Sequence, residues 1–420
     1  MQTLKGKKLL LIGFTLFSMF FGAGNLIFPP YLGAQAGTNL CPAFAGFAVS
    51  AIGLPIAGVI AVARADGLPN LAGRVHPVFS QVFTVLAYLS IGPLLAIPRT
   101  ASTSFEMLVP LVGNSRSFQF VYSLLFFTAA FLVALKPEKL TSRLGRVLCP
   151  LLIGLIVLLF ASCLVRPVAS GYGIPSEAYA SLPAMQGILD GYQTMDAIAG
   201  LNFGAVIALN IQALGITEPQ EIEHGTIRAG GIAACLLFVI YAMLTHIGGL
   251  AGAVWPGAST GAETLANLSN GLFGRAGQVL LAAIFIVACF NTCVGLIACV
   301  GQYFHELLPC IPYPVIAAFF ALTSMLISNI GLAGLLTLSL PLLNAIYPIS
   351  IALIFLSFLP KRFQRPSVYR FCIGLTAVQS IPAALPLGIL SSLANSLPLS
   401  SLGFGWVVPA VVGILLGFVV

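Results

Sequence analysis

Apolar stretches long enough to cross a membrane follow one another along almost the whole chain. Of the 420 residues, 59% are hydrophobic and only 7% are charged, and the mean hydropathy is +1.05. A soluble domain carries roughly 25% charged residues, because water must solvate its surface. A chain so poor in charge cannot cover its exterior with polar groups, so we expect lipid to solvate it.

These stretches have the length of transmembrane helices. A helical span needs about 20 apolar residues, whereas a barrel strand has about ten residues that alternate between apolar and polar. That alternation is absent, and helices satisfy their own backbone hydrogen bonds in lipid. The sequence therefore predicts an all-α polytopic membrane protein with about twelve transmembrane helices, near residues 9–36, 40–63, 76–108, 118–136, 145–167, 190–214, 225–252, 273–308, 312–330, 334–359, 368–392 and 403–420.

Basic residues are distributed unevenly over the joints between the spans. If the amino terminus is cytoplasmic and the spans alternate, fourteen Lys and Arg residues lie on the cytoplasmic side and three on the other. This is the positive-inside pattern, and it predicts that both termini are cytoplasmic. It also explains the net charge of +7 without a nucleic-acid partner. The cytoplasmic group is Lys5, Lys7, Lys8, Arg64, Arg74, Lys136, Lys139, Arg143, Arg146, Arg228, Lys361, Arg362, Arg365 and Arg370, against Arg116, Arg166 and Arg275.

Two spans carry glycine and polar residues near their middle. Span 1 contains Gly22-Ala23-Gly24-Asn25, followed by Phe28-Pro29-Pro30. Span 6 carries Asp196, Gly200, Asn202 and Gly204 within the stretch 191–204. Glycine permits unusual backbone dihedral angles, so we expect both helices to be discontinuous near the midplane. The alternative is that these glycines only let neighbouring helices approach closely.

The two interrupted spans occupy equivalent places in the chain. Spans 1–5 cover residues 9–167 and spans 6–10 cover 190–359, joined by a loop at 168–189 that is rich in Pro, Gly, Ser and Tyr. Because five is odd, the second block enters the membrane from the opposite side. The sequence therefore predicts a single domain over 1–420: a five-plus-five inverted repeat with discontinuous helices 1 and 6, then two additional helices at 360–420. Paired broken helices indicate the binding site of a transporter.

A break in helix 1 would free backbone groups that can bind charged ligands. The amides of Ala23 and Gly24 begin the second half, where the helix dipole attracts an anion such as a carboxylate. Carbonyls at the end of the first half can take an ammonium group or a cation. In span 8, Asn291 and Thr292 offer oxygen atoms suited to a hard cation. The alternative is that Thr292 bonds a carbonyl of its own helix.

Three charged residues lie within or beside spans. Arg99 is in span 3, where a charge is costly and is a functional candidate by default. Glu106 follows seven residues later on the same helix face, so a structural Arg99–Glu106 ion pair is the alternative to a role in gating. Asp196 either faces the outer vestibule or caps the start of helix 6.

The sequence contains no motif of an enzyme or of a metal protein. Its nine cysteines include no CxxC pair, and most lie in apolar spans, where thiols behave as small apolar side chains. We found no phosphate-binding GxxxxGK[ST], no nucleophile elbow and no His/Cys metal spacing. We therefore predict no enzymatic activity, no cofactor and no metal beyond a transported cation.

At these residues the chain resembles the bacterial leucine/isoleucine/valine:cation symporter family. The likeness runs over nearly the whole chain. The chain is also similar to the wider superfamily with the leucine-transporter-type fold. The most specific strings are FGAGNLIFPP at 21–30, GPLLAIPRTA at 92–101, GY with TMD at 191–196, FG at 203–204 and AIYP at 345–348.

The resemblance implies import of leucine, isoleucine and valine with a cation, usually sodium. It implies that the substrate carboxylate meets the amides of Ala23 and Gly24, and that Asn25 serves a cation or the substrate. It also implies a further cation position, where Asn291 departs from the Ser or Thr that is common in the superfamily. We expect substrate-binding residues among Gly22, Ala23, Gly24, Asn25, Asp196, Asn202, Phe203 and Gly204, with the aliphatic side chain near Phe203 and Gly204. The expected cation ligands are carbonyls of Ser18 and Phe21 with Ala288, Asn291 and Thr292.

The predicted function is secondary active import of a branched-chain amino acid by cation symport with alternating access. The predicted location is the bacterial cytoplasmic (inner) membrane, with leucine, isoleucine, valine, Na⁺ or H⁺ and the lipid bilayer as partners. The alternatives are a carrier of the same fold for another small neutral amino acid, or coupling to protons. A channel fits less well, because broken helices favour an occluded binding site over an open pore.

The charge bias makes the topology testable. Reporter domains fused after Arg365 and after residue 180 should lie on opposite sides of the membrane, because only the first position follows a basic joint. Alkaline phosphatase and green fluorescent protein activities of the fusions would measure this. Reporters on the same side would contradict the predicted orientation.

Overall fold

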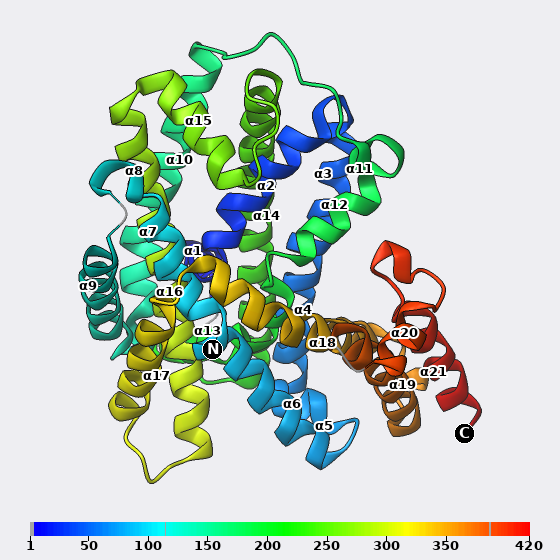
Figure 1. Cartoon of the computed structure of the whole chain (residues 1–420). Coiled ribbons are helices and arrows are strands. Elements are labelled where there is room, and N and C mark those ends of the chain that lie inside the picture. The colour runs from blue at the N-terminus through cyan, green and yellow to red at the C-terminus, as the bar shows by residue number, and fades with distance from the viewer. Residues whose placement is uncertain (1–3, 114, 386–387) are drawn as a thin grey trace.

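The computed structural model describes residues 4–113, 115–385 and 388–420, and these residues form helices and the turns between them (Figure 1). The helices of the first half are α1 (Gly6–Phe20), α2 (Ala23–Ala36), α3 (Leu40–Ala48), α4 (Leu54–Ala65), α5 (Leu68–Gly73), α6 (Pro77–Leu89), α7 (Ala96–Glu106), α8 (Val109–Val112), α9 (Arg116–Ala134) and α10 (Cys149–Val165). The second half contains α11 (Glu177–Ser181), α12 (Pro183–Tyr192), α13 (Asp196–Gln212), α14 (Pro219–Val254), α15 (Gly261–Phe273), α16 (Arg275–Leu307), α17 (Tyr313–Ser328), α18 (Leu332–Phe358), α19 (Pro366–Ala384), α20 (Ile389–Asn395) and α21 (Val407–Val419).

Short 3-10 and π segments complete the helical structure. The 3-10 turns are η1 (Gly37–Asn39), η4 (Pro137–Lys139), η6 (Lys361–Phe363) and η7 (Ser400–Leu402), and the π segments are η2 (Val49–Gly53), η3 (Ser90–Leu94) and η5 (Thr141–Leu148).

The helices confirm a multi-pass helical membrane protein. Within the described residues, 7 segments are long and apolar enough to cross a membrane, or up to 9 if each of 2 bent helix pairs is one span. One segment, Ala23–Ala65, contains Gly37, where a φ of +49° ends α2. Two shorter apolar helices, α17 and α21, lie outside that count. The total of about twelve spans stays a prediction.

Helix 1 is discontinuous where the sequence predicts it. α1 ends at Phe20, and α2 begins at Ala23. Between them Phe21 (φ −75°, ψ 85°) and Gly22 (φ −118°, ψ −153°) leave the helical region. The predicted break at Gly22-Ala23-Gly24 is therefore confirmed.

Helix 6 is also broken, but earlier than the glycine pattern indicates. α12 and α13 meet at an angle of 47° across residues 193–195, and Met195 adopts the left-handed region with φ +68°. The predicted loop at 168–189 is wrong in part, because it contains α11 and the start of α12. Gly200 and Gly204 lie inside continuous α13. An ideal Cβ would lie 2.3 Å from the Pro55 carbonyl oxygen at Gly200 and 2.9 Å from Val62 Cγ1 at Gly204, so these two glycines serve helix packing.

A third interruption divides helix 3, which the sequence did not lead us to expect. η3 separates α6 from α7, and Gly92 inside it has a non-helical ψ of −125°. Pro93 follows and has no N–H for the helical ladder. The kink turns the start of α7 toward helices 1 and 6.

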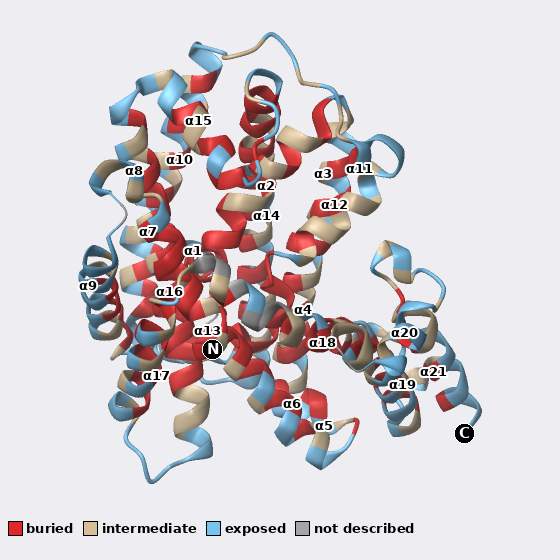
Figure 2. Cartoon of the chain, viewed as in Figure 1, coloured by how far each residue is buried: buried red, intermediate tan, exposed pale blue. Residues whose placement is uncertain are grey.

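Burial separates the interior helices from the lipid-facing ones. Figure 2 shows buried residues concentrated around α1, α13 and α16, whereas α9 and α17 are mainly exposed on their outer faces. Many of these exposed residues are large and apolar, such as Leu125 at 66% and Phe319 at 59% exposure. A large apolar exterior is expected for a protein that lipid surrounds. α19, α20 and α21 project from one side of the molecule (Figure 1).

Glycines bring α2 and α14 into backbone contact. An ideal Cβ at Gly33 of α2 would lie 2.0 Å from the Thr245 carbonyl oxygen. At Gly248 of α14 it would lie 2.2 Å from the Pro30 carbonyl oxygen, and at Gly252 it would lie 2.6 Å from Ala34 Cα. Small residues spaced by four permit such close approach between membrane helices. This contact fixes the second half of broken helix 1 against α14.

Gly248→Ala should destabilise the protein, because a methyl group at this position meets main chain that cannot rotate away. We expect a loss of about 1–3 kcal/mol in the free energy of unfolding, as for other overpacked interiors. Thermal melting in detergent would measure it. Gly231→Ala in the same helix is the matched control, because its Cβ meets nothing within 4 Å. Equal melting temperatures for the two variants would contradict the close contact.

Candidate functional site

The breaks in helices 1, 3 and 6 meet at a small cavity. Its volume is ≈ 50 Å³, and it lies deep among buried residues. Its wall comes from α1, α2 and the junction between them, from η3 and α7, from the residues between α12 and α13, and from α13 and α16. Residues that are far apart in the sequence therefore converge on one point.

Backbone amides face this cavity at the start of α2. Gly22 N donates to Asn25 Oδ1 at 3.0 Å, and Leu26 N donates to the Gly22 carbonyl at 3.3 Å. The amides of Ala23 and Gly24 have no acceptor among the described residues. The first amides of a helix lack an intrahelical partner, so they can bind an anion together with the helix dipole. The predicted residues Gly22, Ala23 and Gly24 all line the cavity.

A buried polar cluster lies beside these amides. Asn25 Nδ2 donates to Asp196 Oδ2 and to the hydroxyl of Tyr241, which comes from α14. Asp196 begins α13 and is only 4% exposed. Thr194 in the break donates its hydroxyl to the Gly191 carbonyl at 2.9 Å. Asp196 thus lies inside the protein, in the wall of the cavity. It is also the first residue of α13.

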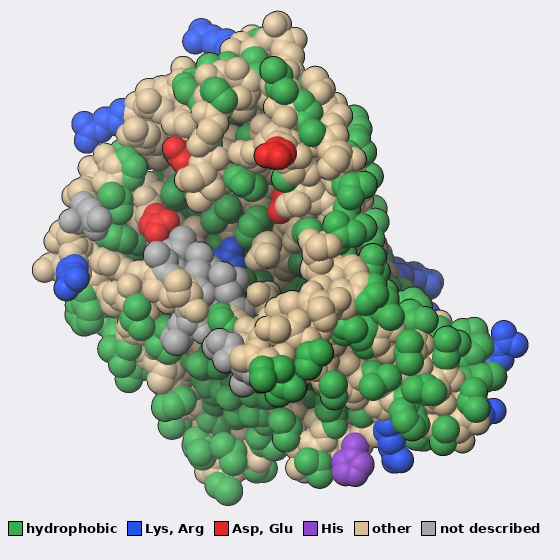
Figure 3. Space-filling view, turned by 45° about the vertical axis from the view of Figure 1, so that its right-hand side comes forward, with side chains coloured by type: hydrophobic (Ala, Val, Ile, Leu, Met, Phe, Trp, Pro, Cys, Tyr) green, Lys and Arg blue, Asp and Glu red, His purple; other side chains and the backbone are tan. Residues whose placement is uncertain are grey.

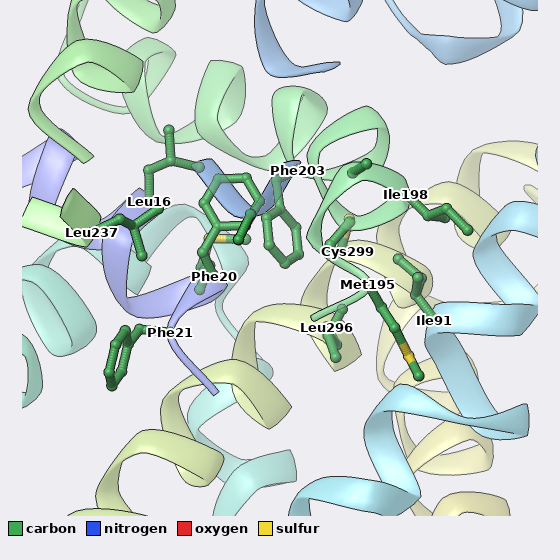
Figure 4. Close-up of a cluster of buried hydrophobic side chains, with 14 of the residues drawn as sticks. Leu16, Phe20, Phe21, Ile91, Met195, Ile198, Phe203, Leu237, Leu296 and Cys299 are labelled. Carbon is green, nitrogen blue, oxygen red and sulfur yellow. The ribbon is translucent and has the colours of Figure 1, made fainter. Parts of the chain in front are cut away.

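Apolar side chains form another part of the wall (Figure 4). The rings of Phe20 and Phe203 lie 5.0 Å apart in an edge-to-face arrangement. Ile91 and Leu296 complete the wall from helix 3 and α16. The cavity therefore combines a polar end at the amides with an apolar end at Phe203.

Buried polar atoms without partners occur on α1 and α16, two helices that pack against each other. Thr292 Oγ1 is buried, has no hydrogen-bond partner among the described residues, and would lie 2.7 Å from an ideal Cβ at Gly22. Both polar atoms of the fully buried Asn291 side chain, and the Ser18 hydroxyl, also lack partners in the part of the chain that the structure describes. Phe21, directly after α1, and Ala288 in α16 are also fully buried. Such buried polar atoms are rare and call for an explanation, such as an ion. The alternative for Thr292, a bond to its own helix, is not what the structure shows.

Arg99 reaches the same cavity and not Glu106. Its side chain is 7% exposed, and Nη1 donates to Met195 Sδ at 3.5 Å. Its Cζ lies 5.8 Å above the Phe28 ring. Glu106 ends α7 and is exposed. Among the described residues the one ion pair, 4.0 Å long, joins Arg64 to Glu223, so the Arg99–Glu106 ion pair is not present.

Two predicted substrate residues lie away from the cavity. Asn202 Nδ2 donates to the Ile198 carbonyl of its own helix at 2.7 Å. Gly204 instead borders a larger cavity of ≈ 540 Å³ between α4, α6, α13 and the end of α16. In α13, residues 202 and 204 point away from the face that carries Ala199 and Phe203. Figure 3 shows a hollow on one face of the molecule, with acidic side chains around it and a basic side chain within it.

Sequence reasoning missed several residues of the site. Thr194 and Met195 belong to the string at 191–196, but methionine rarely adopts positive φ, so no local signal placed the helix 6 break at Met195. Thr100 lines the cavity one residue after Arg99. Tyr241 had no local signal, because it lies within an apolar stretch of α14 and meets Asn25 only through folding.

Comparison with known proteins then decides the family. The chain matches the family model described as "Branched-chain amino acid transport protein" over residues 5–420. The chain belongs to this family. It is 40% identical to the branched-chain amino acid permease BraB of Bacillus subtilis, with 100% of this chain and 96% of the permease covered. It is 39% identical to the permease BrnQ of the same organism, with 98% and 96% covered. Family membership confirms a membrane transport protein and not an enzyme.

Solved structures show which fold this family member has. Mhp1, a nucleobase-cation-symport-1 family transporter in a closed conformation with bromovinylhydantoin bound, aligns with a TM-score of 0.66 at 12% identity over 98% of this chain and 91% of Mhp1. MhsT in complex with L-phenylalanine aligns with a TM-score of 0.56 at 16% identity over 99% and 100%. These similarities confirm the predicted leucine-transporter-type fold.

Gly24→Val should abolish leucine binding by this family member while it still folds. An ideal Cβ at Gly24 lies 3.3 Å from Arg99 Nη2 and 3.4 Å from Thr194 Cα, so the two methyl groups of valine would fill the space before the amides. Radiolabelled leucine binding to purified protein measures the effect. Gly154→Val on α10, where a Cβ meets nothing within 4 Å, is the control for a β-branched residue in a span. Normal binding by Gly24→Val would place the substrate elsewhere.

Proposed function

We propose that this protein imports leucine, isoleucine and valine together with a cation, most simply Na⁺, by secondary active transport with alternating access. The observation that carries the proposal is the cavity at the helix 1 break, which has free amides at one end and an apolar wall at the other. An α-amino acid with an aliphatic side chain has the same division into charged and apolar ends. The permeases of Bacillus subtilis that it resembles are named for branched-chain amino acids.

The substrate end of the proposal uses the two walls of the cavity. The carboxylate would bind the amides of Ala23 and Gly24, since a helix N-terminus favours an anion. The aliphatic side chain would lie between Phe20 and Phe203, where burial of each CH₂ group contributes about 0.8 kcal/mol. Asn202 and Gly204 do not belong to the proposed substrate site, because they lie on other faces of α13.

The cation end uses the oxygen atoms near Gly22. Ser18, Phe21 and Ala288 would supply carbonyl oxygens, and Asn291 and Thr292 would supply side-chain oxygens. The unpartnered atoms of Asn291 and Thr292 support this assignment. Oxygen ligands suit a hard cation and need no net charge from the protein.

We extend the proposal to topology. It comprises twelve spans arranged as a five-plus-five inverted repeat, 9–167 and 190–359, followed by two helices, with both termini cytoplasmic. Discontinuous helices in equivalent positions support the repeat, and the bias of Lys and Arg supports the orientation. Movement of one block against the other would expose the central cavity to each side of the membrane in turn.

Leucine uptake into proteoliposomes tests the function. With the purified protein, an inward sodium gradient should drive accumulation of radiolabelled leucine above its external concentration, and saturable uptake should be stimulated by leucine inside. A proton gradient alone should fail to do so. Accumulation driven by protons and not by sodium would show that the coupling ion is H⁺. Uptake without saturation would indicate a channel.

Thr292→Ala should raise the sodium concentration needed for half-maximal uptake, because it removes one proposed oxygen ligand. We expect an increase of several-fold, measured as uptake against sodium concentration at fixed leucine. Thr323→Ala on α17 is the matched control, since the Thr323 hydroxyl donates to the Phe319 carbonyl of its own helix at 2.8 Å. Unchanged sodium dependence in Thr292→Ala would remove this residue from the cation site.

A further inference from the structure

Arg99 is a buried cation that the described residues leave almost without acceptors. A guanidinium has five N–H donors, and only Met195 Sδ, a weak acceptor, receives one at 3.5 Å. The Phe28 ring lies beside the guanidinium and adds a cation–π contact, which accepts no conventional hydrogen bond. Burial of a charge is unfavourable unless it is paired, so this arrangement calls for an anion.

Position shows where that anion would bind. Arg99 Nη2 lies 3.3 Å from the ideal Cβ position of Gly24, beside the amide end of α2. The guanidinium and the free amides of Ala23 and Gly24 therefore point at the same volume of the cavity. A guanidinium can bind a carboxylate through two parallel hydrogen bonds, which a helix N-terminus alone cannot offer.

A buried carboxylate, that of Asp196, lines the same cavity beside the start of α2. Asp196 is 4% exposed, and one of its oxygens accepts from Asn25 Nδ2. It is close enough to Arg99 for an electrostatic interaction, yet the two form no ion pair within 4.0 Å in the described part of the chain. Two opposite charges that face one cavity without contact leave a gap with a positive and a negative side.

We propose that Arg99 and Asp196 clamp the head group of a zwitterionic α-amino acid, with Arg99 on its carboxylate and Asp196 on its ammonium group. The inference rests on the proposed function and specifies how that site selects its substrate class. A zwitterion supplies the missing partner to both buried charges at once. An amine would leave Arg99 unpaired, and a fatty acid would leave Asp196 unpaired, so each would bind weakly.

The test compares three ligands of similar shape on the full-length protein in detergent with sodium present. Leucine carries both charges, leucinamide lacks the carboxylate, and 4-methylpentanoate lacks the ammonium group. Competition against radiolabelled leucine in the parent protein gives the reference preferences. Arg99→Gln and Asp196→Asn each remove one charge with little change in shape. Direct binding of each labelled ligand to these variants gives their preferences among the three ligands.

The clamp predicts a crossed result. Arg99→Gln should reduce the preference for leucine over leucinamide by about tenfold or more and leave the preference over 4-methylpentanoate nearly unchanged, because hydrogen bonds to charged groups contribute most to such discrimination. Asp196→Asn should show the reverse. Arg64→Gln is the matched control for loss of an arginine, since Arg64 is half-exposed and pairs with Glu223. It should bind all three ligands as the parent does.

Other outcomes would overturn the clamp. Either variant keeping the preferences of the parent, or losing affinity for all three ligands equally, would give the residue a structural role only. If a variant is monodisperse but binds none of the three ligands, leucine binding is measured again with Arg99→Lys or Asp196→Glu, which keeps the charge at that position. Leucine binding regained with the charge supports the clamp, and continued loss rejects it. A parent protein that does not bind leucine would reject the proposed function, and the clamp with it, whereas normal leucine binding with unchanged preferences in the variants rejects the clamp alone.

Discussion

A backbone inside a membrane must find partners for its own amide and carbonyl groups, and this constraint organises the whole protein. Within the described residues helices 1, 3 and 6 are broken, and each break releases groups that lipid cannot satisfy. The structure gathers the three breaks around one cavity, shielded by other helices, so that the released groups face each other and not the hydrocarbon. Glycines on α2 and α14 allow the main chains to approach closely enough to enclose that region. The outer helices are then free to carry large apolar residues toward lipid.

The sequence allowed the class of fold to be predicted because that class depends on composition and on long apolar stretches. The break in helix 1 was predictable for a local reason: Gly22 and Gly24 stand close together, and glycine readily adopts backbone angles outside the helical region. Pro29 and Pro30 lie further on, inside continuous α2, and do not mark the break. The break in helix 6 was displaced because glycine has two uses. Gly200 and Gly204 admit the Pro55 carbonyl and the Val62 side chain, and nothing in the sequence distinguishes that use from a break. The actual break centres on Met195, a residue type that rarely adopts positive φ.

Only part of the site was accessible to the same reasoning. Gly22, Ala23, Gly24 and Asn25 could be found because they sit together in the chain. The seven-residue spacing of Arg99 and Glu106 placed them on one face of an ideal helix. Their pairing failed because α7 ends at Glu106, which leaves one residue outside and the other buried. Tyr241 joins Asn25 across 216 positions, a contact that only the packed bundle specifies.

Thr292 stands directly against Gly22, the residue at which helix 1 turns from one half to the other. An ion held by Thr292 and an amino acid held by the next amides would share this single joint. In thermodynamic terms the two ligands would be linked, because each stabilises the same arrangement of the joint and so raises the affinity of the other by an equal factor. The strength of coupling would then depend on the contact between one glycine and its neighbouring threonine.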